Sequence, residues 1–90
     1  YVLMLCKVHP KSHGKISLYN GDPMNKPKID PNYLAHEDDM KVMLTGFKKS
    51  REILAQTAFD LYRLKEQEPG MQVQTDEQIC EYIRNHAQTI

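Results

Sequence analysis

Histidines are the residues of this sequence with the clearest capacity to bind a metal ion. There are four of them: His9, His13, His36 and His86. The first two are four positions apart, but Pro10 and Gly14 break any helix that would align them. The other two fall at the expected start and end of helices, and a cation near a helix end suits the helix dipole. Because a zinc site needs four convergent ligands, the spacing predicts solvated or structural histidines and no metal site.

Three consecutive carboxylates, Glu37, Asp38 and Asp39, are the next candidates, as metal ligands or as acid–base groups. Negative charge in the first turn of a helix is favoured by the helix dipole, which explains them without a ligand. Ser12 precedes His13, but the Gly-x-Ser-x-Gly context of an activated serine is missing. The sequence also lacks the Gly-x-Gly-x-x-Gly and Walker patterns that bind phosphates. The residues therefore predict no catalytic, cofactor-binding or metal site within this chain.

Two cysteines, Cys6 and Cys80, lie 74 positions apart and have no metal-type spacing. Each has an apolar neighbour, so we expect both thiols to be buried and reduced. Reduced thiols are typical of a cytoplasmic protein.

The composition describes an ordinary small globular domain. The 90 residues include 12 Lys and Arg against 12 Asp and Glu, so there is no basic excess of the kind that nucleic-acid binders carry. The longest apolar run, residues 1–6, is far shorter than the roughly 20 residues of a membrane span. No signal-peptide pattern is visible.

The first half of the chain predicts a small antiparallel sheet. Residues 2–8 are almost continuously apolar, which indicates a strand buried on both faces. Residues 15–18 alternate and should pair with it as a hairpin. The proline-rich stretch 20–31 allows a turn at 20–23 and at most a short edge strand at 28–30. A chain that opens inside a strand is expected to be a fragment of a longer protein.

The second half predicts helices. A long helix over 37–56 carries an apolar stripe at helical spacing, and Arg51 on that stripe must reach solvent or find a partner. Val42, Gly46 and Ile53 form a second apolar face, which suggests a helix covered from two directions. A short helix, or a continuation of the long one, is expected over 57–64, and a final helix over 76–87. Thr75 and Gln78 make a capping box at its start. The stripe of the long helix comprises Met40, Met43, Leu44, Phe47 and Leu54.

Together these elements predict an α+β fold, with a small antiparallel sheet (a hairpin and a short edge strand) backed by two main helices. By physics alone, this would be a partial domain without a self-contained site.

The segment from Pro10 to Leu18 resembles the Pro-x-Ser-Arg-Gly-x-Val-x-Leu pattern of the glucose–methanol–choline (GMC) flavoprotein oxidoreductases, with His13 where the family usually has Arg. Residues 22–34 are similar to that family's Asp-Pro followed by Pro-x-Ile-Asp-Pro-x-Tyr-Leu. The resemblance continues, in order, to the end of the chain and is closest to the choline and alcohol dehydrogenase branch. Its later matches are Asp39, 51–53, Glu66, 69–70, 75–78, 82–84 and Thr89.

The resemblance implies that residues 1–90 are part of a C-terminal substrate-binding domain. In such an enzyme FAD is bound by another, Rossmann-type domain, and a histidine accepts the proton of the alcohol while a hydride moves to the flavin. The resemblance places that histidine in a His-Pro-x-Gly-Thr-Cys segment after Ile90, so His86 does not take this role. No catalytic or cofactor-binding residue is carried onto this chain.

The expected partners are therefore the remainder of the parent chain with its FAD-binding domain and, for the parent, choline or another alcohol. We expect neither nucleic acid binding nor a membrane span, a parent in the cytoplasm or at the periphery of the inner membrane, and a fragment that self-associates and is inactive alone. The alternative is a stand-alone binding or scaffold module without catalysis.

Overall fold

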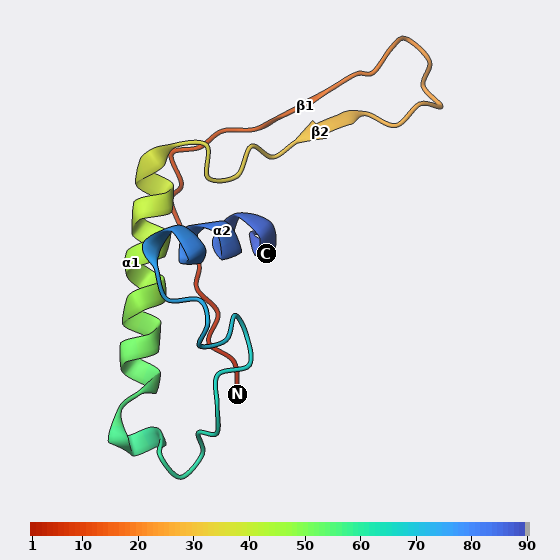
Figure 1. Cartoon of the computed structure of the whole chain (residues 1–90). Coiled ribbons are helices and arrows are strands. Elements are labelled where there is room, and N and C mark those ends of the chain that lie inside the picture. The colour runs from red at the N-terminus through yellow and green to blue at the C-terminus, as the bar shows by residue number, and fades with distance from the viewer. Residues whose placement is uncertain (90) are drawn as a thin grey trace.

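The structure is a computed structural model and describes residues 1–89. It contains two short strands, two α-helices and one 3₁₀ turn, joined by long irregular segments (Figure 1). This is the small α+β arrangement that the sequence predicts. In chain order the elements are β1 (Lys15–Ser17), β2 (Lys28–Asp30), α1 (Glu37–Leu54), η1 (Thr57–Phe59) and α2 (Asp76–His86).

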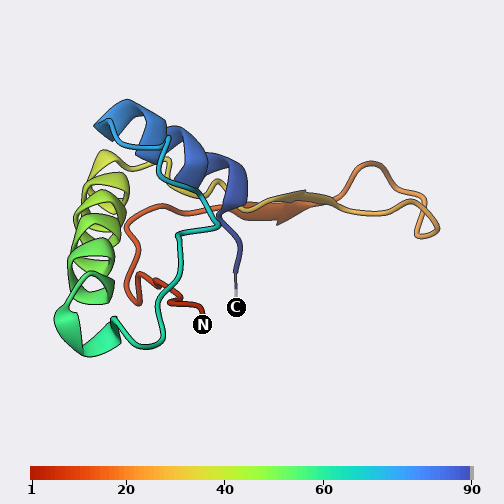
Figure 2. The same ribbon diagram turned by 60° about the horizontal axis from the view of Figure 1, so that its bottom comes forward.

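The two strands form an antiparallel ribbon that projects away from the helices in both views (Figures 1 and 2). Ile16 lies opposite Ile29, and the flanking pairs are Lys15 with Asp30 and Ser17 with Lys28. Because successive side chains alternate between faces, one face of the ribbon is apolar and the other polar. Both isoleucines are exposed, at 72% and 67%.

Glycine is required at the base of this ribbon. A Cβ atom on Gly14 would lie 2.2 Å from the Asp30 carbonyl oxygen. At the far end the chain reverses where the Asn25 N–H donates to the Asp22 carbonyl (3.2 Å), which overlaps the predicted turn.

The first predicted strand, residues 2–8, does not form, and the predicted hairpin partner is wrong. β1 pairs with β2, and residues 2–8 belong to no strand. Burial on both faces is also wrong, since Val2 is 86% and Val8 75% exposed. The physical reason is that a strand requires a neighbour for its backbone hydrogen bonds, and residues 1–89 place none beside this segment.

Helix α1 forms where the sequence predicts it and ends two residues earlier. His36 is its N-cap, and the His36 Nδ1 accepts a hydrogen bond from the Asp38 N–H (3.1 Å). Of its predicted stripe, Met40 is buried. Met43, Leu44 and Phe47 pack against the core. The predicted helix over 57–64 shortens to the three residues of η1.

The second apolar face of α1 is only partly covered. Gly46 forms a notch for Leu5, whose Cδ1 would lie 2.8 Å from a Cβ placed on that glycine. Val42 and Ile53, in contrast, are about half exposed, at 50% and 51%. Of these three positions, Gly46 is therefore the one that the structure shows covered from a second direction, by Leu5.

Helix α2 begins with the predicted capping box. The Thr75 hydroxyl accepts from the Gln78 N–H, and the Gln78 side chain accepts from the Thr75 N–H. Ile79 and Ile83 of this helix are buried against Met40 of α1. These three residues form the buried hydrophobic core of residues 1–89, and Ile79 is the most deeply buried of them, at 1% exposed.

The molecule is elongated for its size. Its principal extents are 59 × 26 × 23 Å and its radius of gyration is 17.2 Å, against about 12 Å for a compact chain of 90 residues. Its accessible surface is 7694 Å², whereas a compact protein of this mass exposes about 5,400 Å². The excess, roughly 2,300 Å², is surface that the chain itself does not cover.

Replacing the most buried core side chain should loosen the contact between the two helices. Ile79→Ala removes a side chain that is 1% exposed and should destabilise this packing by about 2–5 kcal/mol. Faster hydrogen exchange of the α2 amides is the expected readout. Glu81→Ala, on the exposed side of the same helix, is the matched control and should change stability by less than about 0.5 kcal/mol. Equal exchange in the two variants would contradict the core assignment.

Candidate functional site

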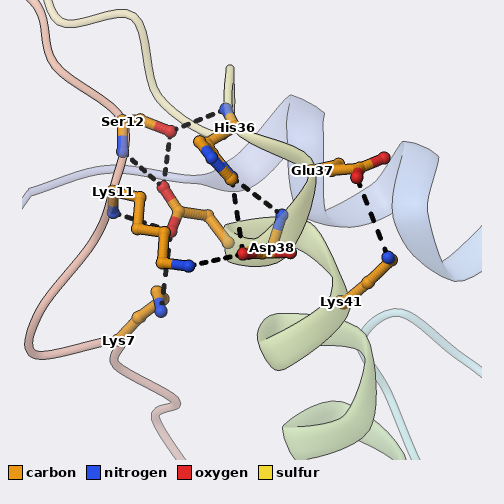
Figure 3. Close-up of polar contacts among 8 residues, drawn as sticks. Lys7, Lys11, Ser12, His36, Glu37, Asp38 and Lys41 are labelled. Carbon is orange, nitrogen blue, oxygen red and sulfur yellow. Dashed lines mark hydrogen bonds and ion pairs between the residues drawn. The ribbon is translucent and has the colours of Figure 1, made fainter.

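The most elaborate polar cluster surrounds Asp39 in the first turn of α1. This carboxylate is 1% exposed, although it is an acid on a helix of a small chain. Its Oδ1 accepts from the Lys11 N–H (2.8 Å), and its Oδ2 accepts from the Ser12 N–H (2.8 Å) and the Ser12 hydroxyl (2.5 Å). The Lys7 Nζ lies 3.5 Å from Oδ1 (Figure 3).

These contacts hold Asp39 ionised. The Lys11 N–H is the largest cause that lowers the pKa of Asp39, followed by the Ser12 hydroxyl, and together with the Ser12 N–H and the charge of Lys7 they outweigh the opposing effect of burial. The pKa of this carboxyl therefore lies well below its usual range. A carboxylate with donors on both oxygens, and with no pKa near neutrality, is poorly suited to act as a general base.

Ser12 connects the cluster to the start of the helix. Its hydroxyl donates to Asp39 and accepts from the His36 N–H (2.9 Å). On the surface of the same cluster, the Lys11 Nζ pairs with Asp38 (2.6 Å), and this pair lowers the pKa of Asp38 (Figure 3). The serine hydroxyl is therefore engaged in fastening residues 11–12 to α1 and is not presented to solvent as a nucleophile.

The three carboxylates predicted as a charged helix start divide into different roles. Glu37 is exposed and faces Lys41 at 3.9 Å, an ordinary pair one turn apart. Asp39 alone is buried. The sequence did not predict the burial of Asp39, because an acid in a first helical turn has the same local pattern whether it is solvated or enclosed. Ser12 and Lys11, its donors, are 27 and 28 positions away.

A second cluster surrounds Arg51, for which the sequence predicts either solvent or a partner. The guanidinium binds Glu66 through two hydrogen bonds, Nε to Oε2 (2.9 Å) and Nη2 to Oε1 (2.6 Å). It also donates to the carbonyls of Val73 (2.6 Å) and Gly70 (3.1 Å), and it lies over the Phe47 ring. Arg51 therefore fastens the irregular segment 66–73 to α1.

The remaining candidates are scattered. His9 and His13 are exposed. His86 stacks on Tyr82, with ring centroids 4.2 Å apart. Among residues 1–89, no group of three or more His, Cys, Asp and Glu side chains is placed to hold a metal ion.

The predicted burial of both thiols is wrong for Cys6 and holds only in part for Cys80. Cys6 is exposed, because residues 2–8 form no strand and nothing covers its side of the segment, whereas Cys80 is half-buried and packs against the core. Within residues 1–89, no helix combines the length and apolarity needed to cross a membrane.

The described residues do not fit FAD as a complete binding site. A dinucleotide pyrophosphate is typically bound at a helix N-terminus with free backbone N–H groups. His36 caps α1. Thr75 and Gln78 cap α2. Neither helix start thus offers the glycine-rich, uncapped turn that such a cofactor needs, and we derive no chemical step through a flavin on these residues.

Comparison with known proteins identifies the class to which this chain belongs. Residues 10–90 match the family model described as GMC oxidoreductase. The chain belongs to the GMC oxidoreductase family, as its motifs predict. Its relatives include choline dehydrogenases and an alcohol dehydrogenase, the branch that the motifs resemble.

Two relatives define how much of such a protein is present. The oxygen-dependent choline dehydrogenase of Pseudomonas aeruginosa (strain LESB58) is 45% identical over 78 residues, which are 87% of this chain and 14% of that protein. The alcohol dehydrogenase [acceptor] of Pseudomonas putida is 40% identical over all 90 residues, which are 16% of its length. The chain thus spans about one sixth, or less, of the curated relatives that it matches.

The Asp39 cluster should open in acid. The pKa of the Asp39 carboxyl is lowered in the folded state. The carboxylate therefore stabilises the fold at pH values above its unfolded-state pKa of about 3.9, and this stabilisation is lost as the pH falls toward the folded-state pKa. After correction for intrinsic rates, amide protection at Lys11 and Ser12 should therefore decline below about pH 4. Asp39→Asn should remove this protection already at neutral pH.

The matched control is Asp38→Asn. It removes the neighbouring acid, which pairs with Lys11 only on the surface, and should leave the two amides protected. Equal loss of amide protection in both variants would contradict the assignment of this attachment to Asp39.

Proposed function

We propose that residues 1–90 form part of the C-terminal substrate-binding domain of an FAD-dependent dehydrogenase that oxidises choline or another alcohol. Such a reaction removes a hydride and a proton from the CH–OH group and yields a carbonyl, with the flavin as hydride acceptor. The chain supplies part of the scaffold around the substrate and has no activity by itself. The observation that carries the proposal is 40% identity with an alcohol dehydrogenase over the whole chain, which is 16% of that relative.

The chemistry of the described residues supports a scaffolding role. The buried acid, Asp39, has donors on both oxygens from within the chain. Among residues 1–89, Arg51 is the cation that donates the most hydrogen bonds, and it donates them to Glu66 and to two backbone carbonyls. Both clusters position segments rather than present reactive groups. The proton acceptor and the flavin site are accordingly assigned to other parts of the parent chain.

The surface of the chain supports packing against a larger body. Apolar side chains are exposed on the ribbon, on residues 61–64 after η1, and along residues 1–8. Examples are Leu18 (83%), Met24 (87%), Leu61 (91%) and Leu64 (93%). The partner we propose for this surface is the remainder of the parent chain, including its FAD-binding domain. We place the parent in the cytoplasm, or at the periphery of the inner membrane.

The first test compares the complete gene product with the isolated chain. The purified complete protein should show flavin absorbance and reduce an electron acceptor with choline or a primary alcohol. The purified 90-residue chain should show neither, because residues 1–89 offer no complete cofactor site and we assign the proton acceptor to another part of the parent chain. Reproducible flavin binding by the isolated chain would contradict the assignment. A complete product without flavin and without dehydrogenase activity would favour the stand-alone scaffold module.

The isolated chain should also self-associate. Its total accessible surface exceeds what a compact monomer of this size exposes, and many of its large apolar side chains are exposed. Light scattering should give a mass above that of the monomer, and the mass should rise with concentration. A clean monomer at high concentration would count against a covered surface in the parent.

A further inference from the structure

The far end of the β1–β2 ribbon carries an asparagine followed directly by a glycine, Asn20 and Gly21. Both residues are exposed, and this end of the ribbon points away from the helices in both views (Figures 1 and 2). A Cβ atom placed on Gly21 would have no neighbouring atom within 4 Å. Solvent therefore reaches both the Asn20 side chain and the Gly21 backbone.

The backbone nitrogen of Gly21 is free to act as a nucleophile. Within residues 1–89, the Gly21 N–H donates no hydrogen bond. Because no acceptor holds this proton, hydroxide from solvent can remove it. Glycine also carries no side chain that would hinder the approach of its nitrogen to the preceding side chain, and its backbone adopts many conformations.

The side-chain carbonyl of Asn20 is held as an electrophile. Its Oδ1 accepts hydrogen bonds from the Asp22 N–H (2.9 Å) and from the Asn25 Nδ2 (3.0 Å). Two donors on one carbonyl oxygen draw electron density from Cγ, and they stabilise the negative charge that develops on the oxygen when Cγ is attacked. The tip of the ribbon thus brings an amide carbonyl with two donors next to an unbonded backbone nitrogen.

We propose that Asn20 is a site of intramolecular deamidation in which the Gly21 nitrogen is the nucleophile. This nitrogen loses its proton to hydroxide and forms a bond to the Asn20 Cγ. The bond between Cγ and Nδ2 breaks, and Nδ2 takes a proton from water and leaves as ammonia. The product of this step is a cyclic succinimide that joins the two residues.

Water then opens the succinimide at either of its carbonyl carbons. Cleavage of the bond from the nitrogen to Cγ gives aspartate at position 20. Cleavage of the bond from the nitrogen to the main-chain carbonyl carbon gives isoaspartate, in which the chain continues through the former side chain. The net reaction consumes one water and releases one ammonia, and no oxidant or reductant takes part.

The reaction changes the charge of the tip and, for one product, its backbone. Either product adds a negative charge to a chain in which basic and acidic side chains are equal in number. Aspartate retains an oxygen that accepts from the Asp22 N–H and the Asn25 side chain. Isoaspartate lengthens the main chain by one methylene, so these contacts should break and the turn between β1 and β2 should loosen.

The remaining asparagines of the chain are internal controls. Asn25 and Asn32 are each followed by a residue with a long side chain, which hinders the attack. The Asn32 Nδ2 also donates to a backbone carbonyl (2.9 Å). Asn85 lies in α2, where helical hydrogen bonds fix the following backbone N–H. We expect these three to remain amides under conditions that convert Asn20.

The test incubates the complete gene product in its folded state and follows the peptide that contains Asn20 by mass spectrometry. Conversion raises the mass of this peptide by the difference between OH and NH₂, and isoaspartate in it accepts a methyl group from protein isoaspartyl methyltransferase. Because hydroxide generates the nucleophile, the rate should rise about tenfold between about pH 7 and pH 8. The rate in the folded protein should equal or exceed the rate in urea, since unfolding removes the donors on Oδ1.

Two variants of the tip separate the attack from general exposure. Gly21→Ala fits without strain, because the φ of Gly21 is not positive and the space beside it is open, and it should slow conversion about fivefold or more. Met24→Ala is the matched control. It removes a side chain that is 87% exposed at the same tip, and the rate should stay unchanged.

An Asn20 amide that persists in the folded complete protein while it is converted in urea would overturn the proposal, because the native tip would then protect the residue. Equal conversion of Gly21→Ala and the unmodified protein would also overturn it, since the Gly21 nitrogen would not be the nucleophile. The inference does not rest on the proposed function, and flavin content and dehydrogenase activity have no bearing on either outcome.

Discussion

The attachment of residues 7–12 to the first turn of α1 through Asp39 is the constraint on which the rest of this structure depends. One carboxylate binds two backbone N–H groups and a hydroxyl from a segment 27 to 28 positions away. That attachment sets the point from which the ribbon projects and the path by which residues 2–8 run along α1. A buried acid is tolerated there because its donors replace the hydrogen bonds of water, and unpaired burial would be unfavourable.

Hydrogen bonds and ion pairs hold much of this structure together, because the apolar core is small. Met40, Ile79 and Ile83 are buried, whereas many other large apolar side chains are exposed. Asp39 holds one irregular segment to α1, and Arg51 holds another through Glu66, Gly70 and Val73. Helix α1 is thus a common support with a polar clamp near each end. This arrangement supports the scaffolding role that we propose for the chain.

The two α-helices were predictable, whereas the helix expected over 57–64 and much of the sheet were not. The stripe of α1 and the Thr75–Gln78 capping box depend on residues within one or two turns of each other, so local sequence is enough to predict them. The pairing of β1 with β2 was missed in favour of residues 2–8, because strand partners are chosen by long-range geometry. Because of the same error we predicted a buried Cys6 thiol, whereas the structure shows it exposed.

By itself the sequence determined the family, through motifs spread in order along the chain, and the positions of the two helices, through periodicity and capping. Only the tertiary structure decided which first-turn acid is enclosed, which partner Arg51 takes, and why α1 carries Gly46. Each of these answers depends on residues that are distant in sequence and adjacent in space. An acid such as Asp39 has the same local pattern in solvent as in a clamp, and only the arrival of the Lys11 and Ser12 backbone distinguishes the two.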